Sequence, residues 1–289
     1  MVSDENNMKI IDLRNGKLLS KIPRQENDMN RGFFSPSGDR IAIIYNNNTA
    51  RIWDSIFGEA ITPVLKHNSL IDNLRFNNDG TKFYLIGFGD DNIQQFTLST
   101  AYEVGTQSYD GAYSLGGDGV TSPYNFRWNN DGTKFFVANY SADDIVEYSV
   151  SNAYDVTSGT ITEGTNFDVS SYESNVYDVA FNADGTKMFV IGNGGDEINE
   201  WTLSTGFDLS STVTHVSATS LGMSNPAAFD FNPDGTKMVV VDYDSDILKA
   251  FNLSSGFDST TISSYESHDL SPSQWDSAPS GSQYITNYW

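Results

Sequence analysis

The sequence predicts an all-β fold built from internal repeats, and three observations support this prediction. A seven-residue segment of the form aromatic-Asn-x-Asp-Gly-Thr-Lys occurs four times, at residues 76–82, 128–134, 181–187 and 231–237. Each copy is followed by aromatic and β-branched residues, the composition of β-strands. The copies recur at intervals of 52, 53 and 50 residues, a spacing typical of the four-stranded blades of a β-propeller.

The repeated segment, called the turn cassette below, has the chemistry of a β-hairpin. Its Asp-Gly pair supplies the positive-φ positions of a tight turn, and the Asn or Asp before it can hydrogen-bond to its own backbone. Thr-Lys then restarts an extended run. We therefore expect each cassette to join the first and second strands of a blade.

Two weaker cassettes, at residues 34–40 and 272–281, raise the number of turn glycines to six. These are Gly38, Gly80, Gly132, Gly185, Gly235 and Gly281, separated by 42, 52, 53, 50 and 46 residues.

Passing from Gly281 through the C-terminus and on from Met1 to Gly38 covers another 46 residues, so the termini together supply one more repeat. The sequence thus predicts a single six-bladed β-propeller domain over residues 1–289, made of four-stranded antiparallel blades. Its last blade is expected to be closed by strands from both termini, residues 283–288 and 8–13, which leaves no open edge.

Composition limits the class of protein. The 289 residues suffice for one large core, and the absence of cysteine excludes disulfides and thiolate metal sites. The longest apolar runs, such as residues 41–45, are too short to span a bilayer, and polar residues near the start argue against an uncleaved signal peptide. We expect a soluble chain, in a compartment that the sequence does not specify.

The net charge of −22 is unevenly distributed. Residues 1–82 carry a net charge of +1, whereas residues 83–289 carry −23. Such an acidic surface disfavours nucleic acid and anionic membranes as partners, and favours cations, basic partners or simple solubility.

Residues 1–70 resemble bacterial WD40 repeats. Residues 50–54 end a strand in Trp-Asp, and His67 opens the next repeat at the spacing of that family. The resemblance implies a hydrogen-bonded set of His, Asp, Ser or Thr, and Trp within one blade. The blade with Trp53 has Asn48 at its turn and no such His, while the blade with His67 has Asp91 but Phe96 instead of Trp. Neither that network nor the usual scaffold role is therefore expected.

Residues 71–289 resemble a second type of repeat, the YVTN-type or surface-protein propeller repeats of bacteria and phages. The resemblance rests on third strands that follow short polar turns, at residues 91–96, 143–148, 196–201 and 246–251, and on the Leu-Ser-Thr or similar links after them. It implies architecture and little about function. Two repeat types and a charge step suggest a composite, chimeric propeller, recombined in nature or in the laboratory.

Candidate ligand-binding residues come from the first strands, which line the central channel of a propeller. Aligned on the turn glycines, these strands place arginines on one side of the channel and aspartates on the other, with Trp275 in the packing column between them and two tyrosines nearer the mouth. The set is Arg31, Arg75, Tyr124, Arg127, Tyr177, Asp178, Asp230, Trp275 and Asp276. It could bind a small zwitterion or a sugar. Alternatively, the charges pair across a wet tunnel and only stabilise the ring.

Metal and catalytic signatures are weak. Calcium at Asp242, Asp244 and Asp246 would need a Gly and a Glu where Ile247 and Leu253 stand, and Asp is an ordinary hairpin residue. The three histidines, His67, His215 and His268, share no column. No Gly-x-Ser-x-Gly, phosphate-loop or His-Glu-x-x-His motif occurs. We therefore predict no metal site, cofactor or catalytic residue.

These observations favour a non-catalytic binding, recognition or scaffold module. Its partner would be an unknown protein or glycan held by the loops that lead into the first strands, and the chain is expected to be a monomer. One alternative is a propeller hydrolase or lyase acting on a sugar or lactone at the channel mouth. Another is an engineered or recombined propeller without a selected ligand.

Overall fold

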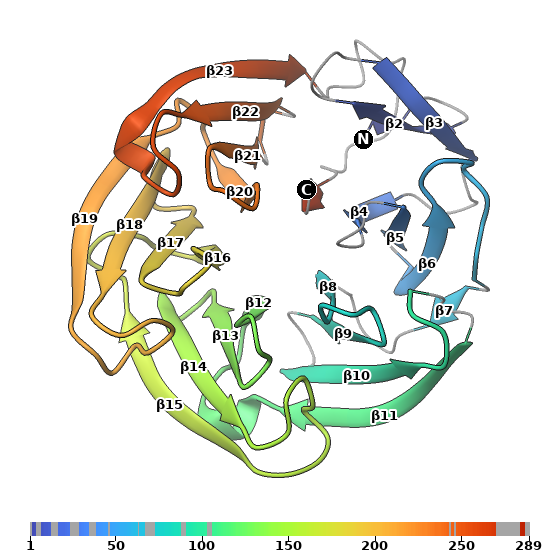
Figure 1. The fold of residues 1–289 in the computed structure, drawn as a ribbon, viewed down its shortest axis with the longest axis horizontal. Helices are drawn as coiled ribbons and strands as arrows, with labels where there is room; N and C mark the ends of the chain where they lie inside the picture. The colour runs from blue at the N-terminus through green and yellow to red at the C-terminus, as the bar shows by residue number, and fades with distance from the viewer. Residues whose placement is uncertain are drawn as a thin grey trace.

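The computed structural model describes residues 2–3, 7–12, 17–23, 29–34, 39–45, 47–62, 64–66, 73–87, 91–102, 106–242, 244–245, 247–269 and 284–286. Within these residues the regular secondary structure is β-strand, apart from two single-turn 3₁₀ helices, η2 (Gly116–Asp118) and η3 (Ser259–Thr261). The sheets are arranged in a ring around a central axis, like the blades of a propeller (Figure 1). No helix of the described chain is long and apolar enough to cross a membrane.

Four sheets are four-stranded, antiparallel blades. The first contains β8 (Asn73–Phe76), β9 (Lys82–Ile86), β10 (Asn92–Leu98) and β11 (Gln107–Ser114). The second contains β12 (Pro123–Trp128), β13 (Lys134–Asn139), β14 (Asp144–Val150) and β15 (Ile161–Asp168). The third contains β16 (Val176–Phe181), β17 (Lys187–Gly192), β18 (Glu197–Leu203) and β19 (Val213–Ser220). The fourth contains β20 (Pro226–Phe231), β21 (Lys237–Asp242), β22 (Ile247–Leu253) and β23 (Ile262–Asp269).

The remaining strands form two sheets of a different kind. One is three-stranded and contains β1 (Val2–Ser3), β2 (Asn7–Asp12) and β3 (Lys17–Pro23). The other is five-stranded and contains β4 (Met29–Phe34), β5 (Arg40–Tyr45), β6 (Thr49–Asp54) and the two-residue β7 (Leu65–Lys66), with β24 (Tyr284–Thr286) added beside β4.

The prediction of six four-stranded antiparallel blades is therefore wrong in number, because the described structure has four such blades. The predicted closure is also wrong. The C-terminal strand β24 does not join the sheet of β2 but pairs in parallel with β4. A physical reason is that β2 has β1 on one side and β3 on the other, so neither of its edges is free. Strand β4 pairs with β5 on one side only, and β24 pairs with its other, inner edge.

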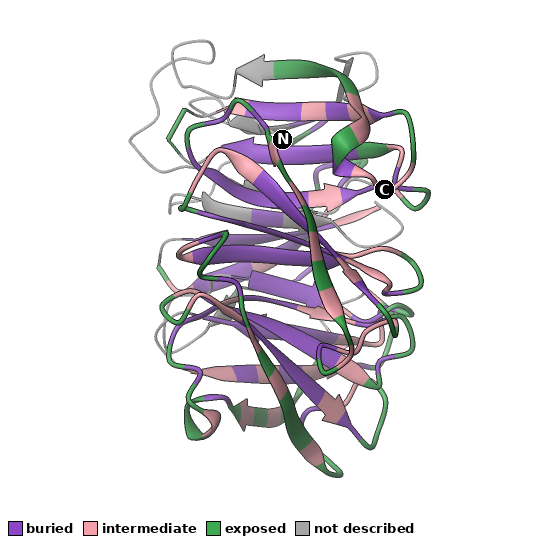
Figure 2. Cartoon of the chain, turned by 90° about the vertical axis from the view of Figure 1, so that its left-hand side faces the viewer, coloured by how far each residue is buried: buried purple, intermediate pink, exposed green. Residues whose placement is uncertain are grey.

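The hydrophobic core lies between neighbouring blades. One cluster joins Phe136 of β13 to Val179 and Met188 of the next blade, and another joins Phe189 of β17 to Val240 of the blade after that. The second strands are buried almost throughout, whereas the outer strand β19 alternates between intermediate and exposed residues (Figure 2). The blades thus stack face to face, and their outermost strands cover the ring.

The turn cassettes fold as predicted in the four regular blades. In the third blade, Oδ1 of Asp184 accepts hydrogen bonds from the backbone N–H (3.0 Å) and the hydroxyl (2.5 Å) of Thr186. Asn182 Oδ1 accepts from the backbone N–H of Lys187 (2.9 Å), and Gly185 has a φ of 72°. These contacts hold the hairpin shut.

Each regular cassette is also covered by an aromatic ring from the loop between the third and fourth strands. Phe207 stands over Gly185, and its backbone N–H donates to the Gly185 carbonyl (3.0 Å). A Cβ at Gly185 would lie 2.3 Å from the Phe207 ring. The same pairing joins Gly80 to Tyr102, Gly132 to Tyr154 and Gly235 to Phe257. We call this pairing the cassette lock.

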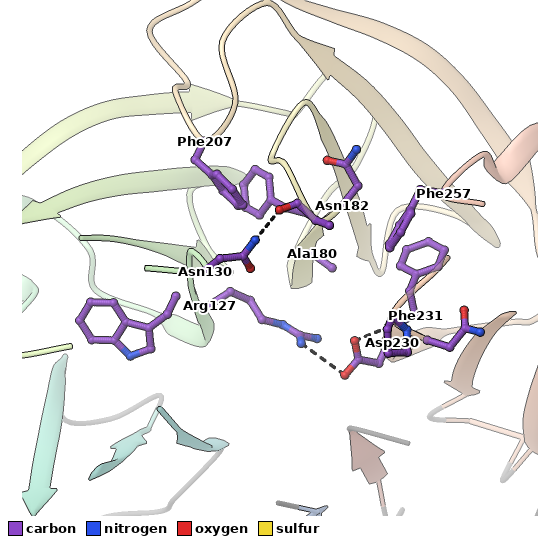
Figure 3. Close-up of a pocket in the computed structure, with 13 residues that line it drawn as sticks. Arg127, Asn130, Ala180, Asn182, Phe207, Asp230, Phe231 and Phe257 are labelled. Atoms are coloured by element: carbon purple, nitrogen blue, oxygen red, sulfur yellow. Dashed lines mark hydrogen bonds and ion pairs between the residues drawn. The ribbon is translucent and has the colours of Figure 1, made fainter. Parts of the chain in front are cut away.

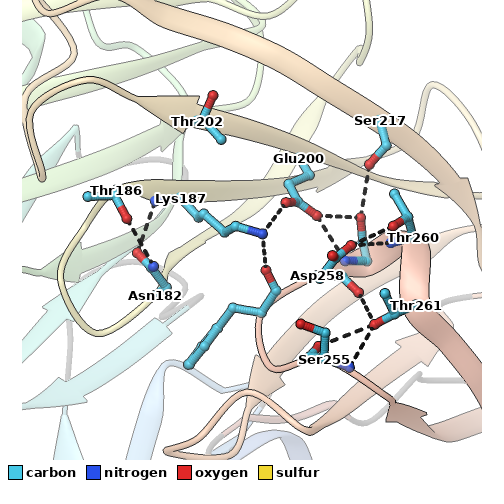
Figure 4. A network of polar contacts seen from close by, with 12 residues as sticks. Asn182, Thr186, Lys187, Glu200, Thr202, Ser217, Ser255, Asp258, Thr260 and Thr261 are labelled. Atoms are coloured by element: carbon cyan, nitrogen blue, oxygen red, sulfur yellow. Dashed lines mark hydrogen bonds and ion pairs between the residues drawn. The ribbon is translucent and has the colours of Figure 1, made fainter.

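Polar clamps connect successive blades (Figure 4). Lys187 Nζ donates to Glu200 Oε1 (2.7 Å) and, across the blade boundary, to the Phe257 carbonyl (2.6 Å). Glu200 Oε2 accepts from the backbone N–H (2.9 Å) and the hydroxyl (2.7 Å) of Ser259. The loop that carries the aromatic ring of one cassette lock is therefore also held by the preceding blade.

Gly185→Ala should destabilise the protein by about 2–5 kcal/mol, because an alanine must adopt a positive φ and displace the Phe207 ring. The control is Gly117→Ala, since a Cβ at Gly117 meets nothing within 4 Å. Urea denaturation of the two variants tests this, and equal unfolding free energies would contradict the cassette lock.

Candidate functional site

The innermost strands of three blades bring Arg127 of β12, Asp178 of β16 and Asp230 of β20 together at the channel. Arg75, on β8, is buried beside them and donates from Nη2 to Asn125 Oδ1 (3.4 Å). Arg31 lies on β4, but its side chain is outside the described residues, as are Trp275 and Asp276. Of the predicted ligand-binding residues, the structure thus brings Arg75, Arg127, Asp178 and Asp230 together, and Asn125 connects Arg75 to Asp178.

Asp178 is the centre of the cluster and is completely buried. Its Oδ1 accepts hydrogen bonds from Asn125 Nδ2 (2.5 Å) and from its neighbour's backbone N–H, that of Val179 (2.9 Å). Its Oδ2 accepts from Arg127 Nη2 (3.2 Å) and from the backbone N–H of Phe229 (3.3 Å). The donors belong to three blades, so this one carboxylate connects the innermost strands and has little capacity left for a ligand.

Arg127 is held between two carboxylates. Besides Asp178, its Nη1 meets Asp230 Oδ2 at 3.4 Å, and its Nη2 donates to the Phe229 carbonyl (3.0 Å). Burial acts to lower the pKa of Arg127, but the charges of Asp178 and Asp230 outweigh it and raise that pKa above its ordinary value. The guanidinium is therefore a permanent, oriented cation.

Asp230 is the most accessible acid of the cluster. Its Oδ1 accepts from the backbone N–H of Phe231 (3.0 Å) and its Oδ2 meets Arg127. Its side chain is 18% exposed, against 0% for Asp178. Both oxygens keep room for a further donor, so Asp230 can contact a ligand or a water molecule.

A pocket of about 350 Å³ opens beside Arg127 and Asp230 (Figure 3). Its walls come from the ends of the innermost strands, the turn cassettes after them, and the rings of two cassette locks. The lining residues are Arg127, Trp128, Asn130, Ala180, Phe181, Asn182, Ala183, Phe207, Asp230, Phe231, Asn232, Pro233 and Phe257. The pocket lies on the cassette face of the ring, opposite the loops that lead into the first strands.

The two predicted tyrosines lie at the other end of the channel. Tyr124 packs against Tyr177 with ring centroids 4.9 Å apart, and Tyr140 lies 5.8 Å from Tyr124 and 5.6 Å from Tyr177. Tyr177 is buried in a cluster with Val241 and Leu248. The structure therefore does not bring the tyrosines together with the pocket, although the sequence placed all of them in one candidate site.

Sequence reasoning missed the aromatic walls of the pocket. Phe207 and Phe257 come from loops far from the channel strands in sequence, and the predicted site did not include them. A signal was present, because an aromatic residue follows each regular turn glycine by 22 positions, at Tyr102, Tyr154, Phe207 and Phe257.

Asp242, one of the aspartates considered for calcium, uses its carboxylate to accept backbone hydrogen bonds in a turn. Asp242 Oδ1 accepts from the backbone N–H groups of Asp244 (3.0 Å) and Ser245 (2.8 Å), and its Oδ2 from that of Asn225 (2.9 Å). Asp246 lies outside the described residues. Among the residues that are described, no group of three or more His, Cys, Asp or Glu side chains could hold a metal ion.

No family model and no curated protein matches the chain. Solved structures do. The chain is similar to the periplasmic gluconolactonase of Pseudomonas aeruginosa, with 14% identity and a TM-score of 0.63 over 91% of this chain and 77% of that one. It is similar to a putative 6-phosphogluconolactonase of Bacteroides fragilis, with 15% identity and a TM-score of 0.62 over 93% of this chain and 78% of that one. A functionally unknown protein of Desulfotomaculum acetoxidans gives 15% identity and a TM-score of 0.63 over 91% and 80%.

At these identities the similarity establishes the fold. The leading prediction from sequence, a non-catalytic binding module, is nevertheless corrected, because similar structures carry the names of sugar lactonases. Those names agree with the first alternative, a propeller hydrolase or lyase acting on a sugar or lactone. No family model of a WD40 or YVTN-type repeat matches the chain.

Asp178→Ala should cost about 3–5 kcal/mol of stability, because it removes the fully buried partner of the Arg127 cation and leaves the backbone N–H groups of Val179 and Phe229 without their side-chain acceptor. Asp230→Ala, the matched control on the next blade, should cost less than half as much, since Asp230 is partly exposed. Chemical denaturation of both variants measures the difference. Equal losses would show that Asp178 is not the centre of the cluster.

Proposed function

We propose that this protein hydrolyses a sugar lactone in the pocket beside Arg127 and Asp230. The observation that carries the proposal is the pairing of an oriented, partly buried guanidinium with a partly exposed carboxylate 3.4 Å away, at the wall of a pocket large enough for a sugar ring. The lactonase names of similar structures support it.

Lactone hydrolysis needs two groups, and the cluster offers both. Negative charge develops on the carbonyl oxygen as water adds to the ester carbon, and a fixed guanidinium stabilises that charge without reorganising. Arg127 takes this role, held in place by Asp178. Asp230 accepts the proton of the attacking water.

The reaction then balances within the pocket. The water oxygen forms a bond to the carbonyl carbon, and the bond between that carbon and the ring oxygen breaks. Asp230 passes the proton it took to the departing ring oxygen, which becomes a hydroxyl. The product is the open-chain hydroxy acid, and Asp230 returns to its carboxylate form.

The aromatic walls suit a sugar ring. Phe231 and Phe257 stand 5.2 Å apart between ring centroids on one side of the pocket, and Phe181 and Phe207 stand 5.4 Å apart on the other. Such faces cover the apolar C–H face of a sugar while its hydroxyls meet polar groups. The rings also limit the access of water around the ion pair, which strengthens its field.

We also propose that the ring is a composite of two repeat types. The four regular blades lie within residues 73–269, whereas the two irregular sheets come from residues 2–66 and 284–286. The boundary agrees with the change of repeat type near residue 70. Trp53, the Trp of the WD-like segment, donates from Nε1 to the Tyr45 hydroxyl (3.2 Å), so its N–H is satisfied without a histidine.

The proposal predicts hydrolysis of aldonolactones above the spontaneous rate, followed by titration of the acid released. Asp230→Asn should lower kcat at least about 100-fold, because the general base is lost. Asp168→Asn is the control, since Asp168 is an exposed residue at the end of β15, and its side chain accepts from the backbone N–H of Ser170. Thermal unfolding confirms that both variants are folded.

A folded protein that leaves a panel of γ- and δ-lactones at the spontaneous rate would overturn the proposal. An Asp230→Asn variant as active as the Asp168→Asn control would overturn the assignment of the base.

A further inference from the structure

The pocket has little positive charge with which to bind an anionic substrate. Of its thirteen lining residues, Arg127 is the single cation and Asp230 the single anion. Arg127 also contacts the buried Asp178, so the three charged groups together carry a net charge of −1. A dianionic phosphate in this pocket would meet a cation that two carboxylates already neutralise.

The lysines of residues 83–289 are all engaged in other contacts and are not available to bind a phosphate. Residues 83–289 contain four lysines besides Arg127, and each has partners in the structure. Lys187 belongs to the polar clamp described above, and Lys134 makes the equivalent contacts with Glu147 and the Phe207 carbonyl (2.8 Å). The partners are Glu147 for Lys134, Glu200 for Lys187, Asn252 for Lys237, and the carbonyls of Leu221 and Gly222 for Lys249.

The rim of the pocket is anionic. The lining residues Asn130, Ala183 and Pro233 are each followed directly by a cassette aspartate, at Asp131, Asp184 and Asp234. Hydrogen bonds from the Thr hydroxyl and backbone N–H two positions later lower the pKa of each of these carboxyls, so all three are charged at neutral pH. Each is therefore the direct chain neighbour of a residue that lines the pocket, and its negative charge repels an anion there at moderate ionic strength.

From this charge distribution we infer that the substrate is an uncharged sugar lactone and that the pocket rejects phosphorylated lactones. The inference rests on the proposed hydrolysis and narrows it to one of the two substrate classes that the similar structures name. The selecting elements are the neutralised Arg127 and the three cassette aspartates, together with the absence of a free basic side chain among the described residues that line the pocket.

The test compares kcat/KM for glucono-δ-lactone and for its 6-phosphate with the full-length protein. We expect at least a 30-fold preference for the neutral lactone at low ionic strength, a magnitude on the order of that expected for like-charge repulsion in a partly desolvated site. The preference should shrink as salt is added, because the rim charges are screened.

A charge-adding variant tests the cause of the preference. Ala183 is exposed at the rim, and Ala183→Lys places a cation there. It should raise the ratio of kcat/KM for the phosphorylated over the neutral lactone about 10-fold. The matched control Ala153→Lys adds the same charge at an exposed loop position outside the pocket lining and should leave the ratio unchanged.

The outcomes separate the two claims. Equal or faster hydrolysis of the phosphorylated lactone would overturn the inference and leave the lactonase proposal standing, as would an Ala153→Lys variant that changes the ratio as much as Ala183→Lys. If neither lactone is hydrolysed above the spontaneous rate, the proposed function fails, and this inference falls with it.

Discussion

The cassette lock is the constraint on which the rest of the structure depends. A turn glycine with positive φ leaves a surface without a Cβ, and an aromatic ring 22 residues later fills that surface. The lock closes each regular blade on itself, because it ties the first hairpin to the loop between the third and fourth strands. The polar clamps then fasten that same loop to the preceding blade.

The candidate site is a consequence of this packing. Phe207 and Phe257 lock their own cassettes and at the same time form two walls of the pocket. On the channel side, the buried Asp178 collects donors from three blades and leaves Arg127 pointing at the pocket. Of these two neighbouring acids, Asp178 has its acceptor capacity used by the fold, whereas Asp230 is partly exposed and can take the proposed role of general base.

The sequence predicts the features that recur in every repeat, and it misses the features that depend on which strand edge is left unpaired. The cassettes, the regular blades and the Arg127, Asp178 and Asp230 cluster follow from aligning turn glycines. The closure does not, because the position of β24 depends on which strand edge is free, and spacing carries no such information. The pocket was missed because its rings come from outer loops. The tyrosines were grouped with the charged columns in one candidate site because a column alignment does not state which side chains share a pocket.

The most direct test of the account is a crystal structure of the protein with a sugar lactam, a stable analogue of a lactone. The account predicts a lactam carbonyl oxygen within hydrogen-bonding distance of the Arg127 guanidinium, and a sugar ring between the aromatic walls on the cassette face. An analogue bound at the tyrosine cluster of Tyr124, Tyr140 and Tyr177, with the pocket beside Arg127 empty, would contradict it.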